Sequence, residues 1–249
     1  MKKAILVLAM CVMSIPAWAQ RWEWPDHAKN LKVLPATTNG KELQRVMYSF
    51  ANGLGVRCGY CHVEQEGKGF GEPDFASDAK PEKDKARLMM QMVKAINGEY
   101  LSKLGMDSTS SLKVSCITCH HGNAVPILLE DKLKKTFDLH GIDSTISQYQ
   151  ALRTQYYGGF TYNFKEGTLV QLADEISEDT TQLAAAATIL KLNIQLYPDF
   201  SYSYARLGGI YEKEGNTQGA IDNYSQAIKL DPRNGMARRE LERLQGSKK

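Results

Sequence analysis

The chain has 249 residues, of which 43% are hydrophobic and 24% charged, as expected of a folded protein with one large or two small domains. Its 31 Lys and Arg residues nearly balance its 28 Asp and Glu residues, which gives a net charge of +3. This balance lacks the basic excess of nucleic-acid-binding domains, so it gives no support for nucleic acid as a partner.

The first 19 residues have the pattern of a secretory signal peptide. Two lysines are followed by a short apolar run and then by the tripeptide AWA at 17–19, which fits an A-x-A cleavage site. The apolar run is too short for a transmembrane helix. We therefore expect an exported, periplasmic protein, either free or held at a membrane through a partner.

Two helices are predicted in the first half of the chain. Residues 40–54 place apolar side chains, including Leu43 and Met47, at helical spacing, and Gly55 follows as a C-cap. A second helix is predicted to begin at Pro81 and to end before Gly105. Each of the two helices precedes a cysteine-containing motif.

Every cysteine outside the predicted signal peptide lies in one of two CxxCH motifs. The first consists of Cys58, Cys61 and His62, and the second of Cys116, Cys119 and His120. CxxCH is the attachment signal for c-type haem. The two thiols add to the vinyl groups on one edge of the porphyrin, and the histidine ligates the iron. We therefore predict two covalently bound haem c groups, with His62 and His120 as axial ligands.

Other uses of the cysteines explain less of the pattern. The pairs of a four-thiolate zinc site are usually separated by about 15–20 residues, whereas residues 62–115 lie between these pairs. Disulfides suit an exported protein, and a redox CxxC would be expected next to a βαβ unit, which the sequence lacks. None of these uses accounts for a histidine after each pair.

The sixth iron ligand distinguishes an electron carrier from an enzyme. A methionine opposite the histidine occupies the sixth coordination position, so that the iron is closed to external ligands, and raises the reduction potential. An open sixth position permits catalysis. Met47 lies on the apolar face of the helix before the first motif. Met89, Met90 and Met92 all lie on the helix before the second motif, and spacing alone leaves the choice among them open.

The stretches FANGLGVRCGYCH and ARLMMQMVKAINGEYL…CITCHHG resemble the tetrahaem cytochrome subunit of purple-bacterial photosynthetic reaction centres, and still more its shorter dihaem relatives. The resemblance covers about residues 29–126. It implies units of helix, turn and CxxCH, with a methionine of each helix as sixth ligand. On this resemblance Met47 ligates the first iron and Met89 the second, while Met92 matches a non-liganding methionine. The chain departs from the family in having one pair of motifs, in having His121 where a basic residue is usual, and in its C-terminal half.

That C-terminal half contains a predicted tetratricopeptide (TPR) repeat at 201–234. Pro198 lies 34 residues before Pro232, which is the TPR period, so the helix at 184–198 is predicted to belong to a preceding repeat. Residues 236–245 would form a final capping helix. The matching positions within the repeat are Leu207, Gly208, Tyr211, Gly215, Ala220, Tyr224, Ala227 and Pro232.

These patterns predict a mainly α-helical protein with a signal peptide at 1–19, a dihaem cytochrome c domain at 20–145, a linker at 146–165 and a TPR-like domain at 166–249. We expect a non-catalytic electron carrier whose partners are a redox protein or a membrane electron-transfer complex, docked through the TPR surface. Two other functions fit the same motifs. One is a peroxidase-like dihaem oxidoreductase with one open iron, and the other is a TPR interaction protein with structural haems.

Overall fold

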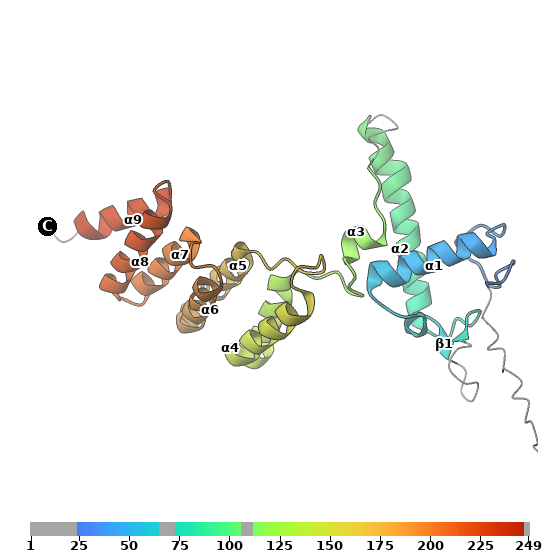
Figure 1. The fold of residues 1–249 in the computed structure, drawn as a ribbon, viewed down its shortest axis with the longest axis horizontal. Helices are drawn as coiled ribbons and strands as arrows, with labels where there is room; N and C mark the ends of the chain where they lie inside the picture. Colours follow the sequence, from blue (N-terminus) through green and yellow to red (C-terminus); the bar gives the residue numbers. More distant parts are fainter. Residues whose placement is uncertain (1–23, 65–72, 106–111, 247–249) are drawn as a thin grey trace, which may run out of the picture.

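The computed structural model describes residues 24–64, 73–105 and 112–246 (Figure 1). The predicted signal peptide at 1–19 lies outside these residues. Within them the protein is mainly helical, as predicted, apart from one pair of two-residue strands. No helix in the described ranges is long and apolar enough to cross a membrane.

Helix α1 (Gly40–Leu54) has the bounds expected from the sequence. The Asn39 side chain caps the first turn by accepting a hydrogen bond from the Glu42 N–H. The Glu42 carboxylate in turn accepts a hydrogen bond from the Asn39 N–H. The helix ends at Gly55, which has a left-handed φ of 64°. The chain then enters the first CxxCH motif through a 3₁₀ turn, Cys58–Tyr60.

Strands β1 (Val63–Glu64) and β2 (Pro73–Asp74) pair antiparallel and lead to helix α2 (Pro81–Ala95). Pro81 occupies the first turn of α2, as predicted. The single helix expected up to Gly105 is divided, because α2 is followed by a π-helical turn, Ile96–Tyr100, and a 3₁₀ turn, Leu101–Leu104. Short helix α3 (Cys116–His120) contains the second CxxCH motif.

Helix α4 (Leu129–Tyr156) is broken at Gly141, where φ is 77°. The Thr136 hydroxyl donates to the Gln148 side chain at 2.7 Å. These residues would lie about 18 Å apart along a straight helix, at about 1.5 Å per residue. The two halves of α4 therefore fold back on each other as a helical hairpin.

The remaining helices follow as antiparallel pairs with a final cap. Tyr224 of α8 packs so closely on Gly208 of α7 that a Cβ at Gly208 would lie 2.9 Å from the Tyr224 ring. This contact uses two of the predicted TPR positions, and a third, Ala227, is fully buried. The helices are α5 (Glu166–Ile176), α6 (Leu183–Leu196), α7 (Ser201–Lys213), α8 (Thr217–Leu230) and α9 (Gly235–Gly246).

The largest hydrophobic core joins α4 to α5, α6 and α7. It includes Leu133 of α4 and Tyr149, Tyr162 and Phe164, which lie in the range expected to be a linker. Because these side chains are buried with the TPR-like helices, we propose that the C-terminal unit begins at α4 rather than at residue 166. Residues 129–246 are called the helical domain below.

Candidate haem-binding sites

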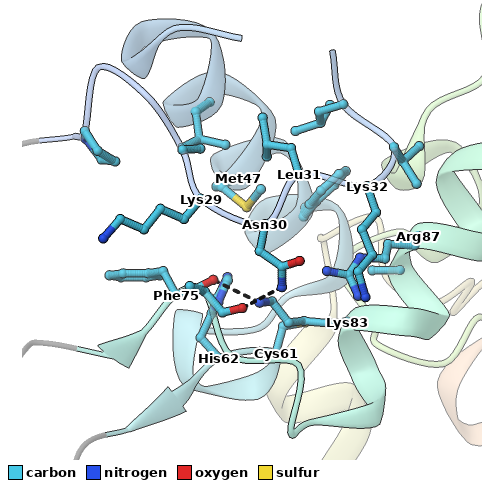
Figure 2. A pocket seen from close by; sticks show the side chains of 18 of the residues that line it. Lys29, Asn30, Leu31, Lys32, Met47, Cys61, His62, Phe75, Lys83 and Arg87 are labelled. Atoms are coloured by element: carbon cyan, nitrogen blue, oxygen red, sulfur yellow. Dashed lines mark hydrogen bonds between the residues drawn. The ribbon is translucent and has the colours of Figure 1, made fainter. Parts of the chain in front are cut away.

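The first CxxCH motif lies at a cavity of about 470 Å³, a size within the usual range for ligand pockets. Three residues predicted to hold the first haem, Met47, Cys61 and His62, all line this cavity. Figure 2 shows Met47 on α1 and His62 below it on the walls of the same cavity. The donor set and the size of the cavity fit a covalently attached haem. Cys58, the other predicted attachment residue, is exposed beside it.

Helix α2 forms another wall of this cavity. Lys83, Ala86, Arg87 and Met90 line it, and they lie three or four residues apart on one helical face. Met90, which the sequence had left as an alternative ligand of the second site, thus lines the first cavity, as Met47 does.

Residues 24–34, called the N-terminal strap below, supply much of the remaining wall (Figure 2). Asn30 Nδ2 donates to the Ala76 carbonyl at 2.7 Å, and Lys32 Nζ lies 2.6 Å from Asp78 Oδ2. Arg87 Nη2 reaches the other Asp78 oxygen at 2.7 Å. Asp78 thus joins the strap to α2, and hydrogen bonds from Arg87 and Lys32 hold the pKa of its carboxyl well below the usual range.

The His62 imidazole is partly buried between Phe75 and the Lys83 ammonium. Its ring lies edge-on to Phe75, with the ring centroids 4.9 Å apart. Burial lowers the pKa of His62 below its ordinary value, and the nearby Lys83 ammonium lowers it further. The neutral imidazole is therefore favoured, which is the form that ligates a metal.

The second CxxCH motif is docked on the end of α1. Gly122 N donates to the Gly53 carbonyl at 2.9 Å, and a Cβ on Gly53 would lie 2.9 Å from the Cys116 Cβ. A Cβ on Gly55 would lie only 2.0 Å from the Gly122 carbonyl oxygen. The two glycines before Cys58 therefore allow the second motif to lie against the helix that carries the first.

The end of α2 also positions the second motif. The Asn97 side chain pairs with both backbone groups of Val114, with Nδ2 donating to the carbonyl and Oδ1 accepting from the N–H, each at 2.8 Å. Asn97 lies in the π-helical turn, a feature frequently found at functional sites. This pairing holds the chain extended just before Cys116. Figure 1 shows α3 beside the end of α1.

Met89 and Met92 lie on the α2 surface away from the first cavity. Neither lines that cavity, and their side chains are 39% and 44% exposed. At about 100° per residue Met89 lies about 60° from both Met92 and Ala86, and about 100° from Met90. Of the stripe expected through Ala86 and Met89, Ala86 lines the first cavity and Met89 does not. Met89 stays a predicted ligand of the second site.

Neither cysteine pair forms a disulfide in the described part of the chain, and Cys58, Cys61, Cys116 and Cys119 are all free thiols. Sequence reasoning missed the N-terminal strap, and it considered Met90 for the second site only. The strap has no helical or strand periodicity that would mark it as part of a site.

Comparisons with known proteins agree with these motifs. Residues 14–187 match the sequence profile of the family described as photosynthetic reaction centre cytochrome C subunit, and residues 201–234 match that of the tetratricopeptide repeat. Cytochrome c-554 of Chloroflexus aurantiacus is 29% identical over 105 residues, which are 42% of this chain and 22% of that protein. The match thus spans about a fifth of that relative.

Several solved TPR structures are also similar. The first TPR domain of human RPAP3 is 19% identical with a TM-score of 0.35, covering 48% of this chain and 88% of that one. The crystal structure of MamA gives 19% identity and a TM-score of 0.35, covering 48% of this chain and 66% of that one. At these TM-scores the likeness carries no argument about function.

The profile match at 14–187 covers well over half of the chain, and it includes both CxxCH motifs and the helices before them. The protein therefore belongs to the photosynthetic reaction centre cytochrome c subunit family, a family of electron carriers with covalently bound haem c, and joins that domain to a tetratricopeptide repeat.

Proposed function

We propose that this protein is an exported dihaem cytochrome c that carries electrons through two His/Met-ligated haems and docks to a redox partner through its helical domain. The observation that carries the proposal is the shared cavity of Met47, Cys61 and His62. This cavity brings together a thiol, an imidazole and a thioether from α1 and the first motif. Together with Cys58 they are the residues proposed for covalent attachment and iron ligation at the first site.

Each residue has a defined part at the first site. Cys58 and Cys61 would attach the ring, and His62 and Met47 would ligate the iron from opposite sides. When bound, haem c supplies an iron that alternates between the ferric and ferrous states. The strap and α2 supply much of the wall of the cavity. Lys29, Lys32, Lys83 and Arg87 on its wall suit the two propionate carboxylates of haem.

The second site is proposed on its motif and its place in the fold. Cys116 and Cys119 would attach the ring, with His120 and Met89 as axial ligands. Docking of α3 on α1 through Gly53 and Gly122 brings this motif beside the first unit. Two sites held against one helix suit electron exchange within the chain. The exposed apolar side chains on α2 would be covered by the second haem.

The proposal is tested on the full chain expressed with a c-type cytochrome maturation system. Intact mass should show two added haems and an N-terminus after residue 19. A variant with Cys116→Ala and Cys119→Ala should carry one haem and keep the absorption spectrum of the first. A mass that matches the bare polypeptide would overturn the proposal.

Carbon monoxide distinguishes an electron carrier from a peroxidase-like enzyme. With both sixth positions closed by methionine, the reduced protein should show no fast spectral change on exposure to the gas. The alternative of one open iron has one observation in its favour, since Met89 and Met92 are both partly exposed. Rapid binding at half of the haem would support that alternative instead.

A further inference from the structure

The turn after the second CxxCH motif is bonded to the helical domain. Asn123 Nδ2 donates to the Tyr162 hydroxyl at 2.7 Å, and His121 Nδ1 lies 3.2 Å from the Phe160 carbonyl oxygen. Tyr162 is only 8% exposed and packs edge-on against Phe164 in the core of that domain. A buried core residue of the helical domain thus reaches the turn that follows the second haem-binding motif.

The same turn orients the predicted iron ligand. His120 Nδ1 lies 2.9 Å from the Asn123 carbonyl oxygen. Because a carbonyl oxygen only accepts, Nδ1 must carry the proton and donate it. The Nε2 lone pair of His120 is then left for a metal. The turn is tight, since His121 and Gly122 both have positive φ, at 51° and 76°.

From this chain of bonds we propose that Tyr162 is a positioning residue for the second haem, acting through Asn123 on His120. The Tyr162 hydroxyl fixes the Asn123 side chain, and a fixed Asn123 holds its carbonyl against the imidazole N–H. A hydrogen bond at this nitrogen sets the ring orientation and raises the basicity of the ligating nitrogen. The inference rests on the proposed function and adds to it a route from the helical domain to the second site.

The route has a functional consequence. A partner that binds the helical domain and shifts the segment at 157–164 would change the bond to Asn123, and with it the potential of the second haem. Such coupling is reciprocal for binding equilibria, so the redox state of that haem would also change affinity for the partner. The helical domain would then be a regulator of the second haem as well as a docking surface.

The test is a reductive titration of the full-length dihaem protein in wild-type and Tyr162→Phe forms. The substitution keeps the buried ring and removes only the hydroxyl. A weaker hydrogen bond to His120 lowers the electron donation of the imidazole, so the midpoint potential of the second haem should rise while that of the first stays unchanged. Tyr156→Phe is the matched control, because its ring contacts Tyr162 and it lies in the same domain.

Two further variants complete the design. Asn123→Ala should raise the same potential, and the double variant with Tyr162→Phe should shift it no further than Asn123→Ala alone, because both act through one bond. The Met47→Ala variant, which should shift the potential of the first haem, identifies which of the two titration steps belongs to that haem. This inference alone would be overturned if the Tyr162→Phe protein carried two haems by mass and the midpoint potential of its second haem were unchanged. An equal shift of that potential in Tyr156→Phe would overturn it as well. Fewer than two haems by mass would overturn the proposed function and this inference with it.

Discussion

Gly122 donates its backbone N–H to the Gly53 carbonyl at 2.9 Å, which joins the turn after the second CxxCH motif to the helix before the first. The two units are thus assembled through a backbone contact that only small residues permit. Gly55 makes the contact closer still, with its left-handed φ of 64° and the Gly122 carbonyl beside it. This junction is the first place to test.

Gly55→Ala should destabilise the protein and disturb the second site. The new Cβ would lie 2.0 Å from the Gly122 oxygen, so the backbone must move. Gly105→Ala is the matched control, since its φ is 65° and nothing in the described part of the chain lies within 4 Å of its added Cβ. The control should cost about 1–2 kcal/mol for the left-handed conformation alone. Thermal unfolding and haem content measure the difference, and equal losses in both variants would argue against a tight junction.

Met47→Ala should lower the potential of the first haem and open its iron to carbon monoxide. Met90→Ala is the matched change, because both thioethers line the same cavity. If Met90 is only a wall residue, its loss should leave the iron closed and, because the side chain is half-buried, cost less packing free energy than the about 2–5 kcal/mol of a fully buried methionine. Carbon monoxide difference spectra of the two variants decide between them. If Met90→Ala opened the iron to carbon monoxide and Met47→Ala did not, Met90 of α2 would be the ligand instead of Met47.

Met89→Ala should open the second iron, while Met92→Ala should leave it closed. Both side chains lie on the α2 face away from the first cavity, so either sulfur can serve the second site by position. The choice of Met89 rests on the family resemblance. The same spectra, recorded with the first haem as an internal reference, measure the outcome. The reverse result would place the ligand one helical turn further along α2.

Asp78→Asn should loosen the N-terminal strap, because Lys32 and Arg87 both lose their charged partner. The depressed pKa of Asp78 means that the folded state favours its ionised form. The stabilisation is therefore present above the unfolded carboxyl pKa of about 3.9 and is lost as the pH falls towards the folded pKa.

Proteolysis within the strap and thermal unfolding at several pH values check this expectation. Wild type should be more stable than the variant at pH 7, and the difference should shrink below about pH 4. Asp84→Asn is the control, since Asp84 also pairs with Arg87 but lies on the exposed side of it. A difference that is independent of pH down to the acid transition would contradict the assignment to Asp78.

A fragment of residues 166–249 should be only marginally folded, whereas one of 124–249 should unfold cooperatively. The shorter fragment lacks α4 together with Tyr162 and Phe164, all of which contribute to the main core. Stacked helical repeats usually need three or more units to bury a continuous core, and the α4 hairpin supplies one of them. Circular dichroism melts compare the two fragments. A sharp transition in the shorter one would restore the boundary at residue 166.

Local patterns predicted the elements of this fold better than their assembly. The helix at 40–54 and the start of α2 at Pro81 were predictable, because caps and helical periodicity depend on residues close together in the sequence. The TPR positions were predictable for the same reason, and the packing of Gly208 on Tyr224 agrees with them. Membership of α4 in the helical core was not predictable, because its long helical pattern contains a break at Gly141.

The candidate haem sites likewise combine features that local sequence predicts with features that depend on long-range contacts. The CxxCH motifs and Met47 are short-range signals, and the structure places Met47, Cys61 and His62 at one cavity. The N-terminal strap is held by long-range bonds from Asn30 and Lys32 to residues beyond position 75, which no local pattern encodes. The bond from Asn123 to Tyr162 spans 39 positions and was equally hidden.

The two faces of α2 have an evolutionary consequence. Met90 lines the first cavity, whereas Met89, about 100° further round the helix, lies outside it and is partly exposed. Insertion or deletion of one residue inside α2 would turn everything after it by about 100° and change which side chains the two surfaces present. Substitutions can adjust either surface separately, but a change in helix length alters both. Members of this lineage are therefore expected to differ by insertions in their loops, while the spacing within α2 stays constant.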